Sequence, residues 1–187
     1  VAPALLAGCT MILKPSELTP LTSIRLVELA TEAGVPAGVL NLVLGPGPTV
    51  GAELTEHQSV DLVSFTGGLE TGKQIMATAA ATVKRVALEL GGKNPHIMFA
   101  DADFDAAVDA ALNGVFFHAG QICSAGTRIL VEETIHDRFV AALKERMAAI
   151  PLGRGTDDAT RMGPLISAEQ RDKVDTWVAR GVAEGAE

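Results

Sequence analysis

The sequence is poor in the residues on which several protein classes depend. Its 187 residues include two cysteines, Cys9 and Cys123, which form no CxxC pair and no Cys/His ligand spacing, so we expect neither a disulfide framework nor a zinc site. The four histidines are scattered without an HExxH or HxxxH pair, so no metal site is expected. No apolar run approaches the roughly 18 residues of a membrane span, and the first residues lack a signal-peptide pattern. These absences predict a cytoplasmic protein without a membrane partner.

Basic residues are also fewer than acidic residues. Fifteen Lys and Arg stand against 23 Asp and Glu, a formal net charge of −8, so nucleic acid is not an expected partner. The composition, with 48% hydrophobic, 20% charged and 4% aromatic residues, is typical of a globular protein. At about 150 residues per domain, the length predicts one domain or slightly more. Because the chain starts at Val1 inside an apolar run and stops at Glu187 without a terminating signal, we expect it to be part of a longer protein.

Apolar residues alternate between the spacing of strands and the spacing of helices along the chain. Strands are expected at 11–13, 39–44, 60–65, 86–90, 95–99 and 129–131. Helices are expected between Pro20 and Gly34, at 50–57 and 70–81, around 139–147, and after the predicted caps Asp103 and Ser167. This alternation predicts an α/β fold with a largely parallel sheet, in which ligands bind at the carboxyl ends of the strands.

Two of the predicted strand ends have features of a nucleotide site. Lys14 and Glu17 lie just past the first strand, where an ammonium donor and a carboxylate acceptor could hold the two hydroxyls of a ribose. An exposed ion pair of little energetic weight is the alternative. The segment 64–73 runs from a strand through Gly67-Gly68 into a helix, whose N-terminus offers unpaired N–H groups and a positive dipole end to a pyrophosphate. It matches neither GxGxxG nor a P-loop, so an ordinary tight turn is equally consistent.

Two further segments carry candidate catalytic groups. Glu89 ends an apolar strand before two glycines, and a carboxylate removed from water there would suit a general base; a sheet edge facing water is the alternative. Cys123 stands in the glycine-flanked loop 120–126, where its thiol and N–H can face a cleft, although a lone cysteine more often packs as a small hydrophobe. We expect Cys9 to pack in this way. His118 is near enough to Cys123 to be considered as its base, but the spacing does not decide this.

Taken together, these segments occur in the order and at the spacings of the NAD(P)-dependent aldehyde dehydrogenase superfamily, which the chain resembles from end to end. The most specific parts are 89–95 (Glu-Leu-Gly-Gly-Lys-Asn-Pro) and 120–123 (Gly-Gln-Ile-Cys), with Glu89 and Cys123 separated by 123 − 89 = 34 positions. The stretch 65–73 (Phe-Thr-Gly-Gly-Leu-Glu-Thr-Gly-Lys) is most similar to the betaine-aldehyde and aminoaldehyde branch. The resemblance implies a Rossmann-type NAD-binding domain at 1–91 and part of an α/β catalytic domain at 92–187.

By this resemblance, Cys123 is the nucleophile and Glu89 the general base. The Cys123 thiolate would add to an aldehyde carbonyl, the tetrahedral adduct would release hydride to the nicotinamide, and Glu89 would deprotonate the water that hydrolyses the thioester. The Cys123 N–H would be one oxyanion donor. Glu17 would repel a 2′-phosphate, so we expect NAD rather than NADP as the cofactor.

The resemblance also assigns the cofactor contacts. They are Lys14, Ser16, Glu17, Gly47, Phe65, Thr66, Gly67, Gly68, Leu69, Glu70, Thr71, Leu90 and Gly91. One departure matters: many members carry Ser where this chain has Gly68, so a hydroxyl contact to the pyrophosphate is absent here.

Some family features lie outside this chain. An Asn oxyanion donor in a Pro-Trp-Asn segment would precede it, and a Glu-Phe segment at the nicotinamide ribose and an oligomerisation strand would follow it. We therefore expect the 187 residues alone to be inactive and the full-length protein to be a homodimer or homotetramer. A CoA-acylating aldehyde dehydrogenase and a non-catalytic nucleotide-binding protein on the same scaffold are the alternatives. Glu89 favours hydrolysis over the first, and the presence of both Cys123 and Glu89 argues against the second.

Overall fold

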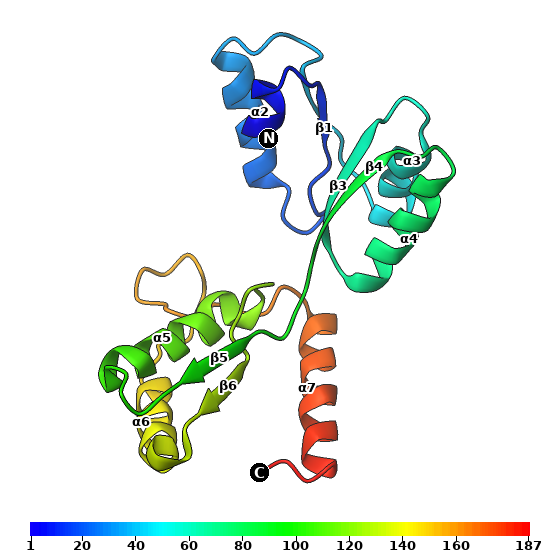
Figure 1. The fold of residues 1–187 in the computed structure, drawn as a ribbon. Coiled ribbons are helices and arrows are strands. Elements are labelled where there is room, and N and C mark those ends of the chain that lie inside the picture. The colour runs from blue at the N-terminus through cyan, green and yellow to red at the C-terminus, as the bar shows by residue number, and fades with distance from the viewer. The chain divides into compact units, whose positions relative to one another are not determined.

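The computed structural model describes residues 1–187, which divide into two compact units, Val1–Glu89 and Leu90–Glu187 (Figure 1). Each unit combines short strands with the helices that connect them, as an α/β fold requires. The strands form three separate pairs, β1–β2, β3–β4 and β5–β6, rather than one continuous sheet. None of the helices has both the length and the apolar character needed to cross a membrane.

The first unit contains nine elements. In chain order they are α1 (Ala2–Leu6), β1 (Met11–Leu13), α2 (Leu21–Glu32), β2 (Leu40–Leu42), the π-helical turn η1 (Gly47–Gly51), α3 (Ala52–Glu56), β3 (Leu62–Gly67), α4 (Leu69–Ala80) and β4 (Arg85–Leu90), whose last residue opens the second unit. Every strand and helix expected in this unit is present, with ends displaced by a few residues.

Strands β1 and β2 form a parallel pair with α2 as the connection between them. Met11 lies opposite Leu40 and Leu13 opposite Leu42, and the Asn41 side chain donates to the Met11 carbonyl at 3.2 Å. Parallel pairing requires a crossover of this kind, because the chain must return to the same end of the sheet. The β1–α2–β2 arrangement thus places the residues after β1 at a carboxyl strand end.

The interior of the first unit lies mainly between α3 and α4. Ile75 and Ala79 of α4 are buried, and Gly72 is buried on the same helix face. Thr55 of α3 is also buried, and its hydroxyl donates to the Gly51 carbonyl at 2.9 Å, so no polar group is left unpaired there. This packing fixes α4 along the unit and with it the position of the helix N-terminus.

The second unit contains seven elements. They are β5 (Pro95–Met98), α5 (Phe104–Phe116), the 3-10 turn η2 (Phe117–Gly120), β6 (Arg128–Val131), the 3-10 turn η3 (Glu133–Ile135), α6 (His136–Ala148) and α7 (Ala168–Ala183). The predicted caps are confirmed: the Ala106 N–H donates to the Asp103 carboxylate at 3.1 Å, and the Gln170 N–H donates to the Ser167 hydroxyl at 3.1 Å.

Strands β5 and β6 are parallel, with Pro95 opposite Arg128, and α5 connects them. Beyond the strands, the Ala100 N–H donates to the Glu132 carboxylate at 2.8 Å, and this bond, with a second from the Thr134 hydroxyl, lowers the pKa of Glu132. The main core cluster lies under this pair and consists of Met98, Val108, Ala111 and Phe139. The second unit therefore has a β–α–β frame with its own hydrophobic core.

Phe139 of α6 is the largest fully buried side chain of this core, with 1% of its surface exposed. Replacing it with alanine is expected to lower the free energy of unfolding by about 3–5 kcal/mol, because the lost apolar contacts leave a cavity that the core cannot fill. Urea unfolding would measure this, with Phe117→Ala, at a 60% exposed position, as the matched control. Equal midpoints for the two variants would contradict this account of the core.

The expectation for Cys9 is wrong. Its thiol is exposed, and only its backbone is held, by an N–H bond to the Ala4 carbonyl at 3.0 Å. Gly8, at φ +78°, turns the chain directly after α1, so Cys9 leaves the helix on the surface instead of continuing its apolar face.

Candidate functional site

Cys123 follows a tight left-handed turn at the end of α5. His118 and Ala119 have φ angles of +50° and +55°, and Gly120 continues the turn at +74°. Such angles are unfavourable for residues with a Cβ atom, and they are found where the surrounding structure imposes them, often beside a functional site. Here they reverse the chain so that residues 121–127 return to the start of β6.

The loop around Cys123 is anchored on both sides. Before it, the Gln121 side chain donates to the His118 carbonyl at 3.0 Å and accepts the Ile166 N–H at 3.1 Å. After it, Ala125 is buried, and the Gly126 N–H donates to the Gly114 carbonyl of α5 at 3.2 Å. These contacts hold the loop without using the cysteine side chain.

Cys123 itself lies at the exposed tip of a turn. The Ala125 N–H donates to the Ile122 carbonyl at 3.2 Å, and the Asn94 side-chain amide donates to the Cys123 carbonyl at 2.9 Å. Within the second unit neither the Cys123 N–H nor its thiol makes a hydrogen bond, so both are available to a ligand. The interpretation of Cys123 as a buried small hydrophobe is therefore wrong.

His118 does not pair with this thiol. Its ring packs against Phe117, with ring centroids 4.3 Å apart, and no hydrogen bond joins it to Cys123. The structure thus gives no support to His118 as the base for this cysteine.

The loop after β1 holds the predicted ribose-binding group. The Lys14 ammonium lies 3.9 Å from the Glu17 carboxylate and donates to the Pro15 carbonyl at 2.9 Å. The Lys14 side chain is 15% exposed and that of Glu17 52%, so the carboxylate faces water while the lysine stem lies along the position of Gly51. The Ser16 hydroxyl accepts the Leu18 N–H at 3.2 Å and stabilises the turn between them. A donor and an acceptor thus stand together at a carboxyl strand end.

Glycines keep the neighbouring backbone open. At Gly47, which begins η1, and at Gly68, a side chain would meet no atom within 4 Å. Gly67 is different: a Cβ atom there would collide with the ring of Phe65, which folds back over the end of β3. A side chain at Gly67 would displace the Phe65 ring, whereas a Cβ atom at Gly47 or Gly68 would meet open space.

The N-terminus of α4 lies directly after this glycine pair. Gly68 is the N-cap and provides no side-chain oxygen, so the N–H groups of Leu69, Glu70 and Thr71 receive no cap. The negative charge of Glu70 in the first turn is offset by Lys73 at 2.8 Å. Thr66, the next-to-last residue of β3, is exposed and precedes this turn. The arrangement offers backbone donors and a positive dipole end to an anionic group.

Glu89 lies near the end of β4, where exposed and half-buried residues alternate. Its side chain is on the exposed face of the strand, Leu90 is half-buried, and a Cβ atom at Gly91 would meet open space. Glu89 closes the first unit and Cys123 belongs to the second, so neither unit contains both groups. No group of three or more His, Cys, Asp or Glu side chains has the geometry of a metal site.

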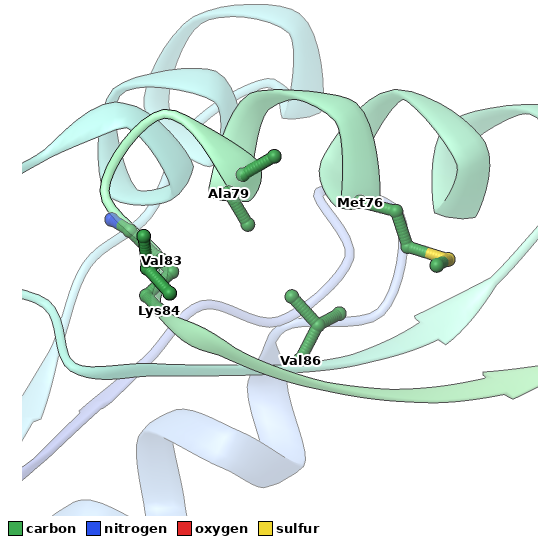
Figure 2. A pocket seen from close by; sticks show the side chains of 6 residues that line it. Met76, Ala79, Val83, Lys84 and Val86 are labelled. Carbon is green, nitrogen blue, oxygen red and sulfur yellow. The ribbon is translucent and has the colours of Figure 1, made fainter.

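The first unit also has a hollow of about 360 Å³, between the second half of α4 and the start of β4 (Figure 2). Its walls are apolar, with Met76, Ala79 and Val86 facing the space in Figure 2. The one charged group, Lys84, already donates to the His57 carbonyl at 2.7 Å. The hollow therefore lacks free polar groups to orient a nucleotide, in contrast to the Lys14 loop and the α4 N-terminus.

Comparison with known proteins agrees with these features. The profile of the aldehyde dehydrogenase family matches residues 1–187. Betaine aldehyde dehydrogenase of Bacillus subtilis (strain 168) is 62% identical over 186 residues, which cover the whole of this chain and 38% of the relative. The structure of betaine aldehyde dehydrogenase from Staphylococcus aureus in complex with NAD+ matches with a TM-score of 0.96 at 57% identity, again over the whole chain and 37% of the neighbour. An apo structure of a point mutant of that enzyme matches with a TM-score of 0.95.

This chain thus spans somewhat over a third of the length of these relatives. The match extends over every residue, at an identity well above the level at which fold and family are conserved together. The resemblance inferred from the motifs at 89–95 and 120–123 is confirmed, and the chain belongs to the aldehyde dehydrogenase family.

Proposed function

We propose that these 187 residues are part of an NAD-dependent aldehyde dehydrogenase that oxidises an aldehyde to a carboxylate, with Cys123 as nucleophile and Glu89 as general base. The observation that carries the proposal is the 62% identity to a betaine aldehyde dehydrogenase over the full chain. The exposed Cys123 thiol, with its N–H free of other partners, supports the assignment of the nucleophile.

The first unit fits NAD. The Lys14 ammonium and the Glu17 carboxylate supply a donor and an acceptor for the hydroxyls of the adenosine ribose. The uncapped N–H groups at the start of α4 suit a pyrophosphate, which can approach because Gly68 leaves the space in front of them open. The absence of a hydroxyl at Gly68 leaves this binding to backbone groups and the helix dipole. When bound, NAD supplies the hydride acceptor of the reaction.

Cys123, in the second unit, would carry out the first covalent steps. The Cys123 thiolate forms a C–S bond to the aldehyde carbon, and the carbonyl oxygen becomes an oxyanion. The free N–H of Cys123 is placed to donate to that oxyanion, which stabilises the charge as it develops. Loss of hydride from the same carbon restores the C=O bond and leaves a thioester on Cys123.

Hydrolysis then frees the cysteine. Glu89 takes a proton from water, the hydroxide attacks the thioester carbonyl, and the C–S bond breaks to give the carboxylate and the thiolate. Overall, an aldehyde, NAD and water yield a carboxylate, NADH and two protons. The acyl group on Cys123 could instead pass to the CoA thiol, which releases the Cys123 thiolate. Product analysis with and without CoA distinguishes hydrolysis from this transfer.

We propose betaine aldehyde, or another aldehyde with a quaternary or primary ammonium group, as the substrate. The names of the relatives support this choice.

The test uses a polypeptide of the relatives' full length that includes this chain. NADH absorbance is followed with betaine aldehyde, with an uncharged aldehyde of similar size, and without aldehyde. Rapid NADH formation with the cationic aldehyde supports the proposal. If the protein binds NAD but forms no NADH with any aldehyde tested, the proposal is wrong and a non-catalytic nucleotide-binding protein is the remaining explanation.

Glu17 sets the preference for NAD over NADP in this proposal. Replacing it with glutamine is expected to raise kcat/KM for NADP relative to NAD by about tenfold, or ~1.4 kcal/mol, because a carboxylate beside the ribose repels a 2′-phosphate. Steady-state kinetics with both cofactors would measure the ratio, with Glu28→Gln on the exposed face of α2 as the control. A parent protein that uses both cofactors equally well would refute this role of Glu17.

A further inference from the structure

Asn94 directly precedes β5, and its backbone is bonded to Arg128, the first residue of β6. The Asn94 carbonyl accepts the Arg128 N–H at 3.1 Å, and the Arg128 side chain donates to the Lys93 carbonyl at 2.8 Å. These two bonds extend the parallel ladder, in which Pro95 lies opposite Arg128. The backbone of Asn94 is therefore fixed relative to the strand that follows the cysteine loop.

From this fixed point the Asn94 side chain reaches the cysteine itself, 29 positions along the chain. Its amide nitrogen donates to the Cys123 carbonyl at 2.9 Å. The NH₂ end of the amide must face that carbonyl, because two oxygens would repel each other at this distance. Gly92 packs beside the same bond, since a Cβ atom there would stand 3.6 Å from the Cys123 oxygen. The segment before β5 thus supports the cysteine turn directly.

The consequence for Cys123 follows from peptide geometry. The peptide before Cys123 is held by the Ala125 N–H bond to the Ile122 carbonyl, and the peptide after it is held by the Asn94 bond to the Cys123 carbonyl. Peptide groups are planar, so fixing both of them fixes φ and ψ of Cys123. Only χ1 then remains to place the sulfur. Because N–H and C=O point in opposite directions across a trans peptide, the Cys123 N–H is directed away from the turn.

We propose that Asn94 is a positioning residue for the nucleophile: its amide fixes the peptide after Cys123 and so aligns the thiolate and the Cys123 N–H for attack on the carbonyl carbon. This rests on the proposed role of Cys123. Without the amide, ψ of Cys123 is free to vary, and a displacement of the sulfur by about 1 Å costs roughly a hundredfold in rate.

The test compares variants in the full-length polypeptide that includes this chain. Asn94→Ala removes the donor, and Asn94→Gln keeps an amide. Asn113→Ala, at an exposed position of α5 where the side chain makes no hydrogen bond, is the matched control. For Asn94→Ala we expect kcat and the rate of the first NADH turnover to fall by about 10- to 100-fold. KM for NAD should stay within about twofold, because the residues proposed to hold NAD lie on other segments. Asn94→Gln should recover part of the loss, and Asn113→Ala should show none.

Two outcomes would overturn the proposal. In the first, Asn94→Ala keeps the parent kcat and first-turnover rate, so the bond has no part in alignment. In the second, Asn94→Gln loses as much as Asn94→Ala, with matching losses of thermal stability and NAD affinity, which indicates a purely structural role. If Asn94→Ala does not fold, Asn94→Asp, which has the same volume but places an oxygen against the carbonyl, replaces it with the same expected loss. Cys123→Ala is run beside them, because activity that survives in that variant refutes the proposed function itself.

Discussion

Replacement of Cys123 by alanine is expected to abolish aldehyde-dependent NADH formation, with a loss of at least about 10⁴-fold in kcat. The measurement is NADH absorbance with saturating aldehyde, in a polypeptide of the relatives' full length. Binding of NAD should persist, because the groups proposed to hold it lie at the Lys14 loop and the α4 N-terminus.

The size of the effect follows from the chemistry. The thiolate forms the bond that turns a planar carbonyl into a tetrahedral centre able to release hydride, and alanine has no atom that can do so. The loop around Cys123 is held by Gln121, Ala125 and Gly126 rather than by the thiol. Replacing the thiol by a methyl group should therefore leave the fold intact. The loss of activity therefore measures the absence of the nucleophile and not a defect in folding.

The chain contains its own control for this experiment. Cys9 is the only other cysteine and is also exposed, but it lies in the first unit, far along the chain from the proposed chemistry. Cys9→Ala should keep full activity. Alkylation by iodoacetamide should inactivate the parent and Cys9→Ala at the same rate. Hydride transfer that survives in Cys123→Ala, or inactivation that requires Cys9, would refute the mechanism.

Much of the local structure could be predicted from sequence because its causes are local. The caps at Asp103 and Ser167 are formed by a side chain and an N–H three residues later, so the pattern alone contains them. Lys14-Pro15 predicts the end of the first strand, and β1 does end at Leu13. The family resemblance was equally accessible, because it depends on short motifs at fixed spacing.

Features that depend on distant segments could not be predicted in the same way. The bond between Asn94 and Cys123 joins residues 29 positions apart, and nothing in the type of either residue indicates it. An Asn before a Pro at the start of a strand was the only available signal. The left-handed angles of His118 and Ala119 likewise arise from the constraint that the loop must return to β6.

Burial was the least predictable property. Large apolar side chains such as Leu6, Trp177 and Val182 remain exposed, and α7 has no buried residue. The relatives that match over this whole chain are more than twice as long.

Replacement of Glu89 by glutamine is expected to slow steady-state turnover by about 10²- to 10⁴-fold while leaving the first turnover nearly intact. Glutamine has the same shape but cannot accept a proton from water. Formation of the thioester on Cys123 does not need this base in our proposal, so each site should still release one NADH rapidly. Rapid-mixing absorbance would then show a burst close to one NADH per site, followed by a slow phase.

The burst separates Glu89 from a group that acts on the cysteine. If Glu89 instead activated the thiol, Glu89→Gln would slow the first turnover as much as the later ones and no burst would appear. Glu56→Gln, at an exposed position at the end of α3, serves as the control and should match the parent in both phases.

Addition of CoA distinguishes an enzyme that hydrolyses its thioester from one that transfers the acyl group to CoA. A CoA-acylating enzyme would bypass water, so CoA would restore rapid turnover to Glu89→Gln, whereas an enzyme that hydrolyses its thioester would remain slow because its only acceptor still lacks a base.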